Sequence, residues 1–384
     1  MNHYFSILLA GFLLLAGCCS STKKQPNQSE TRRIPLIYST DLFQPPDDPD
    51  DHYDLAMLFS LEEIEIKALI FDLASPRRQS SEVGKSALEQ LGKITGQKPP
   101  PWKVGLRNPL SSTDDKAFDQ PEEFQGGVEL ILSTLQQSEE KVVMFLVGSC
   151  RDFLVAFNRN PDLLREKVKA VYVNAGNGPK GIQTEWNVSL DPNAYVGLIT
   201  SGLPIYWCPC FTDVYQVSTP DEVAEGKAIC TYFIVPNQAE LLAPVRATVK
   251  NYFAYALSKS EEEPLGFLDK DVQPIPETPR HMWCTAPFLH AAGRKIYKTR
   301  DCRWISCTPE NAKKMEIEGS AVEIFRFEPT HLISVWKDEN GKMIPDFQHV
   351  DDAESAASVQ VFRYMHPDFN EIIVSALAGI LKTL

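Results

Sequence analysis

A short acidic loop carries the side chains best suited to chemistry. Residues 40–54 contain six aspartates and three prolines. Crowded carboxylates repel one another, and a bound cation or bound protons relieve that repulsion. Hard oxygen ligands on a loop suit Ca²⁺ and, less well, Mg²⁺. The spacing is not that of an EF-hand, because the glycine and the final glutamate of such a loop are missing. The alternative is a solvated acidic turn without a ligand.

A second polar cluster follows the apolar run at 168–173. It contains Asn177, Glu185 and Asn187, whose side chains suit sugar hydroxyls because they combine acceptors with amide donors. The alternative is that they are turn and helix-capping residues. Asp191, just before Pro192, is predicted to cap its own helix.

The elements that position these residues alternate between strands and helices. Strands are expected at 34–38, 65–71, 103–106, 142–147, 168–173 and 204–207. Helices are expected from about Asp50, and at 80–95, 127–137, 153–157, 192–200, 238–258 and 286–293. The alternation predicts an α/β fold with an open, mostly parallel sheet and helices on both faces. A β-hairpin at 322–344 and a helix at 372–384 complete it.

Three positions fall just after predicted strands. They are Asp41, Gly148 and Asn174. Ligands of such sheets collect at the carboxyl ends of the strands. We therefore expect these positions to meet in one crevice.

The first residues read as a targeting segment. An apolar run at 5–16 is too short to span a membrane and ends in Leu15-Ala16-Gly17-Cys18, which is similar to a bacterial lipobox. This predicts a signal peptide at 1–17, lipidation of Cys18, a flexible tether at 18–33 and a domain at 34–384. The protein would be exported and lipid-anchored in the bacterial cell envelope. A plain membrane anchor or a misassigned start codon is the alternative.

Composition limits the partners. The chain has 384 residues and a formal net charge of −13, which argues against non-specific nucleic-acid binding. It has nine cysteines without the spacing of a zinc or redox motif. A disulfide between Cys302 and Cys307 is left open, as is a homo-oligomer.

Four stretches together resemble a known family, the inosine–uridine-preferring nucleoside hydrolases. They are the run at 34–38 leading into Asp41 and Asp50-Asp51, the turn Val147-Gly-Ser-Cys-Arg-Asp152, the segment Glu185-Trp-Asn187 with Asp191-Pro192, and the C-terminal hairpin and helix. The resemblance implies hydrolysis of the N-glycosidic bond of a ribonucleoside, with a bound Ca²⁺.

The resemblance also implies roles for individual residues. Asp41 would be a metal ligand and the general base, and Asp51 a second ligand. A main-chain carbonyl near Arg151 would fill a further metal position. The ribose would be held by Asp50, Asn177, Glu185 and Asn187. A cation lowers the pKa of bound water, and acidic side chains stabilise an oxocarbenium-like transition state.

The chain departs from the family pattern at the late His-Asp pair, which supplies an acid to the leaving base and a metal ligand. Trp283 stands at the histidine position and Cys284 at the aspartate position. His281 could serve as the acid with a local shift. A thiol is a poor Ca²⁺ ligand. The positive charge of Arg151 is a further difference, which could replace part of the metal's role or bind an acidic substrate.

Three functional hypotheses follow. The first is hydrolysis of a nucleoside or related N-riboside with a bound divalent cation. The second is a non-catalytic lipoprotein that binds a sugar or nucleoside on the same fold. The third is a different hydrolase, such as a phosphatase, although no glycine-rich phosphate loop is visible.

Overall fold

The structure is a computed structural model that describes residues 32–46, 48–73, 84–178, 185–212, 216–337, 343–349 and 359–384. Residues 33–384 form one compact unit. Cys18 and the predicted signal peptide lie outside the described residues, as does the tether up to residue 31. None of the described helices is long and apolar enough to cross a membrane.

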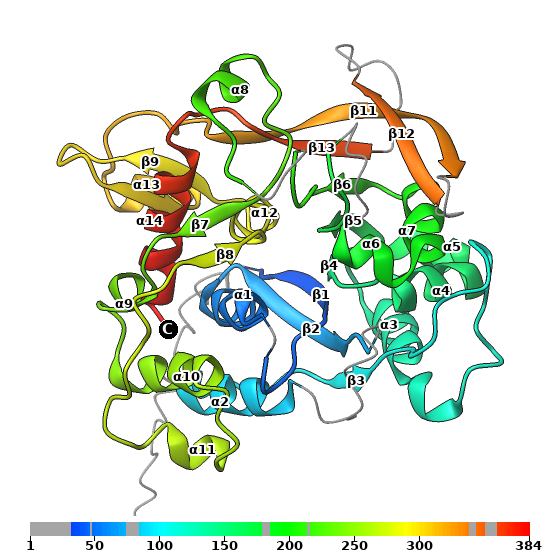
Figure 1. Cartoon of the computed structure of the whole chain (residues 1–384), viewed down its shortest axis with the longest axis horizontal. Coiled ribbons are helices and arrows are strands. Elements are labelled where there is room, and N and C mark those ends of the chain that lie inside the picture. Colours follow the sequence, from blue (N-terminus) through cyan, green and yellow to red (C-terminus); the bar gives the residue numbers. More distant parts are fainter. Residues whose placement is uncertain are drawn as a thin grey trace, which may run out of the picture. The chain divides into compact units, whose positions relative to one another are not determined.

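A nine-stranded sheet organises the described chain (Figure 1), with the strand order β12-β11-β13-β6-β5-β4-β1-β2-β3. Its strands are β1 (Ile34–Thr40), β2 (Ile64–Phe71), β3 (Trp102–Val104), β4 (Val142–Val147), β5 (Val168–Val173), β6 (Ile205–Trp207), β11 (Phe325–Lys337), β12 (Met343–His349) and β13 (Val359–Tyr364). The strands from β13 to β3 pair in parallel, and β11 pairs antiparallel with both β13 and β12. This confirms the predicted mostly parallel sheet with a C-terminal hairpin.

The main helices are α1 (Asp50–Ser60), α2 (Lys85–Thr95), α3 (Gly126–Gln137), α4 (Arg151–Arg159), α5 (Pro161–Lys167), α7 (Pro192–Ile199), α10 (Ala247–Leu257), α12 (Thr285–Ala291) and α14 (Phe369–Leu381). Shorter helices are α6 (Trp186–Leu190), α8 (Pro220–Ala224), α9 (Gln238–Leu241), α11 (Pro264–Phe267) and α13 (Pro309–Lys314).

Two apolar cores lie on opposite faces of the sheet, because successive strand side chains alternate between faces. Leu36 and Tyr38 of β1 join the core formed with α1, α2, α10, α12 and α14, whereas Ile37 joins the core formed with α3, α4, α5 and α7. Figure 1 shows these two helix groups on either side of the sheet. Both strand faces are buried, which explains the near-continuous apolar runs in the sequence.

The helix predicted at 238–258 is wrong as a single element. The structure has α9 and α10 instead, separated by residues 242–246. Pro244 lies in this gap, and proline removes a backbone donor and clashes with the preceding turn of a helix. The two-stranded sheets β7 (Phe233–Val235) with β8 (Arg280–Met282), and β9 (Lys295–Lys298) with β10 (Trp304–Cys307), were not expected from the sequence.

The strand order places a topological switch point between β1 and β4. The chain runs outward from β1 through β2 to β3, and outward from β4 through β5 to β6. Loops at the carboxyl ends therefore diverge at this point and leave room for a ligand. The acidic loop follows β1, so the fold delivers it to the position where such sheets bind ligands.

Candidate active site

The ends of three neighbouring strands bring the expected polar positions together. Thr40 lies beside Val147, and Leu146 lies beside Val173, so β1, β4 and β5 end nearly level. Asp41, Gly148 and Asn174 follow these ends, so all three lie at the same end of the sheet. Their convergence on one ligand stays a prediction. A side chain at Gly148 would place its Cβ 2.3 Å from Oδ2 of Asp72, so the close approach here requires glycine.

The acidic loop enters α1 at Asp50 and Asp51. Both lie in the first turn, where the helix dipole favours negative charge. Asp51 is buried, and the hydroxyl of Tyr38 donates to its Oδ1 at 3.5 Å. Asp50 is half-buried. The loop thus brings the Asp51 carboxyl to β1, with Asp50 beside it in the first turn of the helix.

The carboxylates of the loop act on one another. Burial raises the pKa of Asp51 well above its usual value, and repulsion from Asp41 and Asp50, with a hydrogen bond to Asp41, adds to the rise. Burial and repulsion from Asp48, Asp54 and Asp41 raise the pKa of Asp50 in the same way. The three predicted site aspartates, Asp41, Asp50 and Asp51, therefore form one interacting group.

A buried thiol joins this group from the other end of the chain. Cys284 is the N-cap residue of α12 and is 2 % exposed. Its Sγ donates to Oδ1 of Asn174 at 3.5 Å, and the carboxyl of Asp54 lies within hydrogen-bond reach of the same sulfur. Burial and the charge of Asp54 raise the pKa of Cys284 well above its usual value, so the thiol is neutral. Helix α1, helix α12 and the end of β5 meet at this sulfur.

Strand β8 supplies a cation and an imidazole beside the acidic loop. Nη1 of Arg280 forms an ion pair with Asp48, and Arg280 also opposes the upward pKa shift of Asp50. His281 shares a hydrogen bond with the hydroxyl of Tyr232, and the two rings stack with centroids 5.8 Å apart. Partial burial lowers the pKa of His281, and the charge of Arg280 lowers it further.

Two of the residues predicted to hold ribose, Glu185 and Asn187, bind the backbone here. Glu185 caps α6: its carboxylate accepts from the amides of Gly176 and Asn187 at 2.9 Å and from Val188 at 3.3 Å. The side-chain amide of Asn187 donates to the backbone carbonyl of Asn174 at 3.0 Å. These bonds hold the segment after β5 against the strand end.

The third member of that set, Asn177, forms an isolated parallel bridge with Phe211. Contacts of Asn177, Glu185 and Asn187 with ribose stay predictions. Charge from Asp41 still reaches Glu185 and adds to the rise of its pKa, whose largest cause is burial. This places Glu185 near the acidic loop.

Arg151 is buried in the interior of the domain, where it binds other buried groups. Its Nε donates to Oδ2 of Asp191 at 2.8 Å, and its other nitrogens donate to the carbonyls of Leu106 and Leu190, both at 3.1 Å. Both side chains of the ion pair are fully buried. All three guanidinium nitrogens are engaged, so the idea that this charge replaces a metal or binds substrate is wrong. The role of the carbonyl near Arg151 stays a prediction. Asp191 caps α7 as expected.

Known protein structures share the fold of this chain. No known protein family and no curated protein matches the sequence. Among solved structures, a plant nucleoside hydrolase matches with a TM-score of 0.51 and 14 % identity, covering 91 % of this chain and 99 % of that one. The chain has the nucleoside hydrolase fold.

Two further structures are similar over the same 91 % of this chain. The inosine-uridine preferring nucleoside hydrolase from Bacillus anthracis has 15 % identity and a TM-score of 0.47, and all of it is covered. The type III effector protein XopQ, in complex with adenosine diphosphate ribose, has 14 % identity and a TM-score of 0.46, with 94 % covered. At these identities the likeness concerns the fold alone.

The donor set of this nucleoside hydrolase fold does not match Ca²⁺, the predicted ion. Ca²⁺ takes about six to eight oxygen ligands. Within the described residues, no group of three or more His, Cys, Asp or Glu side chains is arranged to hold a metal ion. The side chain that α12 brings to Asp54 is a neutral thiol, and β8 brings the cation Arg280 to the acidic loop. We therefore assign no chemical step to a bound metal.

Sequence analysis missed Asp54, Tyr232 and Arg280 as members of the site. Asp54 could have been found, because it lies three and four residues after Asp51 and Asp50 and so shares their helix face. Tyr232 directly precedes β7 and Arg280 lies on β8, and these three-residue strands show no periodic pattern. No signal in the sequence placed them beside the loop.

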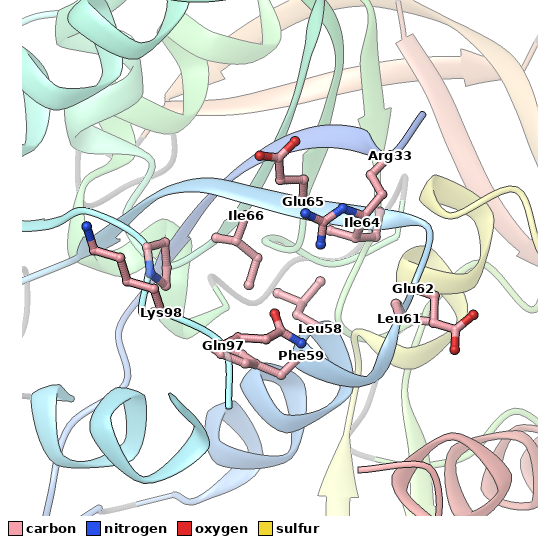
Figure 2. Close-up of a pocket in the computed structure, with 11 residues that line it drawn as sticks. Arg33, Leu58, Phe59, Leu61, Glu62, Ile64, Glu65, Ile66, Gln97 and Lys98 are labelled. Carbon is pink, nitrogen blue, oxygen red and sulfur yellow. The ribbon is translucent and has the colours of Figure 1, made fainter. Parts of the chain in front are cut away.

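A separate cavity of about 510 Å³ lies at the opposite end of the strands (Figure 2). Leu58, Phe59 and Ile64 line it from the end of α1 and the start of β2, and Arg33 and Lys98 contribute charged groups. Ligands in parallel sheets bind at the carboxyl ends of strands. This cavity is at the amino ends and takes no part in the site.

Stability should fall as pH rises from about 4 toward 7, and Asp152 allows a test. Burial raises its pKa to about 7, and Asp72 adds repulsion. The folded state therefore keeps a proton that the unfolded chain loses near pH 4. The stabilisation is complete below that pH and is lost as pH rises toward 7, at about 1.4 kcal/mol per pH unit.

Urea denaturation of wild type and Asp152→Asn between pH 5 and pH 7 measures this effect. The asparagine can still accept from the amide of Leu106, which lies 3.1 Å from Oδ1 of Asp152. The variant should lose stability less steeply with pH than wild type. Parallel curves would show that Asp152 keeps the same charge in both states.

Proposed function

We propose that this protein hydrolyses the N-glycosidic bond of a ribonucleoside or a related N-riboside. The observation that carries the proposal is the gathering of Asp41, Asp50 and Asp51 at the switch point of a nucleoside hydrolase fold. Net negative charge at that position stabilises the positive charge that develops on a sugar ring as the bond to the base breaks.

Asp41 is the proposed general base. It follows β1 directly, interacts with Asp51 and lies near Glu185. A carboxylate at the open end of the sheet can accept a proton from water while the water oxygen attacks the anomeric carbon. Asp50 is the proposed partner of the ribose hydroxyls, since it is half-buried and interacts electrostatically with Asp41. The products are the free base and ribose.

His281 is the proposed acid for the leaving base. Its hydrogen bond and ring stacking with Tyr232 fix the imidazole beside Arg280. The lowered pKa of His281 favours rapid loss of its proton to a base nitrogen. Tyr232, which is buried, acts as a positioning residue for the ring.

One observation favours a second candidate, a binding protein without catalysis. Cys284 is neutral and hydrogen-bonded where an acidic residue is expected from the family resemblance. A site with polar groups but without a complete ligand set for a metal can hold a nucleoside without cleaving it. Export and lipid anchoring through Cys18 stay predictions in either case.

The test is release of reducing sugar from a panel of purine and pyrimidine ribonucleosides by the purified mature chain. Calorimetric titration with the same panel runs in parallel. Turnover of at least one compound supports hydrolysis, and saturable binding without turnover supports the binding protein. Neither binding nor turnover with any nucleoside would overturn both candidates.

A further inference from the structure

Two residues of one short segment bring a cation and a thiol to the acidic loop. Arg280 on β8 and Cys284 at the start of α12 are four positions apart and both contact side chains from the β1–α1 region. Helix α1 packs against both β8 and α12, which Figure 1 shows beside it. One segment therefore sets the charge balance next to the predicted site aspartates.

Arg280 provides positive charge from the protein itself. Its guanidinium is largely buried, with 17 % of the side chain exposed, and it pairs with Asp48. Its charge also reaches Asp50. Its Nε has no hydrogen-bond partner among the described residues, so the guanidinium keeps a donor beyond the ion pair. A fixed guanidinium in this position offsets part of the carboxylate repulsion at Asp48 and Asp50, which a bound cation would otherwise relieve.

Cys284 removes an oxygen ligand from the same region. Its sulfur lies between the carboxyl of Asp54 and Oδ1 of Asn174, with both partners within hydrogen-bond reach. A soft thiol is a poor ligand for a hard cation. The amide nitrogen of Asn174 is already used, since it donates to the carbonyl of Cys208 and to Thr231 at 3.0 Å. The thiol and both polar atoms of the Asn174 side chain are thus engaged within the protein.

We propose that the acidic site takes no resident Ca²⁺, because Arg280 supplies the compensating charge and the Cys284 thiol stands where an oxygen ligand would be needed. The inference concerns the same site as the proposed function and rests on it only for that location. If both hold, the chain hydrolyses N-ribosides with its own side chains and keeps its rate in a chelator.

The experiment measures Ca²⁺ binding and thermal stability, so its result does not depend on activity. The mature chain is titrated calorimetrically with CaCl₂, and its Tm is compared in excess EDTA and in excess CaCl₂. Wild type should show no stoichiometric heat and no calcium-dependent change in Tm. The double variant Arg280→Gln/Cys284→Asp should gain both, with Tm rising by several degrees in CaCl₂ because ligands that bind only the folded state stabilise it.

A matched control is available on the β9–β10 turn. Arg300 and Cys302 are both exposed and lie two positions apart. Arg300→Gln/Cys302→Asp makes the same chemical changes and should stay insensitive to calcium. Stoichiometric Ca²⁺ binding by wild type, or a fall of its Tm in EDTA, would overturn the proposal, and this holds even if the double variant fails to fold. A folded double variant that ignores Ca²⁺ would also contradict the roles given to these two residues.

Discussion

Replacing Asp41 with asparagine is expected to lower kcat for base release by about 10²–10⁴-fold, which is the usual contribution of a general base. The amide keeps the size of the carboxyl but cannot accept the proton of the attacking water. Substrate binding should change less than kcat, because Asp50 and the polar groups after β5 remain. Initial rates over a range of nucleoside concentrations separate the two effects.

The same substitution should raise stability. Asp41 repels Asp51 and contributes to the upward shift of its pKa, so removing the charge relieves repulsion between two crowded carboxylates. Lower activity with a higher Tm is the signature of a functional site held at a cost to the fold. Asp119→Asn, an exposed position, serves as the control and should leave both quantities unchanged. A variant at Asp41 with wild-type kcat would remove this residue from the mechanism.

The largest effect on stability is expected from Arg151→Met, which should lower the free energy of unfolding by about 3–5 kcal/mol. The substitution leaves the carboxylate of Asp191 fully buried without its cation. It also leaves the carbonyls of Leu106 and Leu190 without the donors that Arg151 supplies. Urea denaturation at pH 7 measures the loss.

Two further variants identify the cause. Arg151→Met/Asp191→Asn should recover part of the stability, because the uncompensated charge is gone while an acceptor for the amide of Leu110 remains. Arg165→Met breaks an exposed pair with Asp162 and should cost less than about 1 kcal/mol. Equal losses in the buried and exposed variants would show that packing of the long side chain, and not the buried ion pair, is responsible.

The sheet was predictable from sequence because its signal is local. The runs at 142–147 and 168–173 match β4 and β5 without error, since strands buried on both faces are apolar throughout. The placement of Asp41, Gly148 and Asn174 at one end of the sheet then follows from the parallel strand pairing. The position of the acidic loop at the carboxyl end of the sheet could therefore be predicted from the pattern of apolar runs.

The other half of the site could not be predicted in this way. Arg280 reaches the acidic loop on β8, a three-residue strand without a periodic pattern, and Cys284 reaches Asp54 through the tertiary packing of α12. The family resemblance placed Arg151 near the site, yet its side chain turns to Asp191, a partner 40 residues away. The sequence pattern indicates the backbone position of a residue. The direction of a long charged side chain depends on which buried charge it pairs with.

The pairing of Asp48 with Arg280 has a consequence for the order in which the domain assembles. The two residues are 232 positions apart, and Asn174 and Cys284 are 110 apart. Contacts of such high sequence separation close large loops and form late in folding. During synthesis the acidic loop and the first strands leave the ribosome long before β8 and α12 exist. The sheet can begin to form around its local runs, but Arg280 becomes available to the acidic loop only after more than two thirds of the chain has been made.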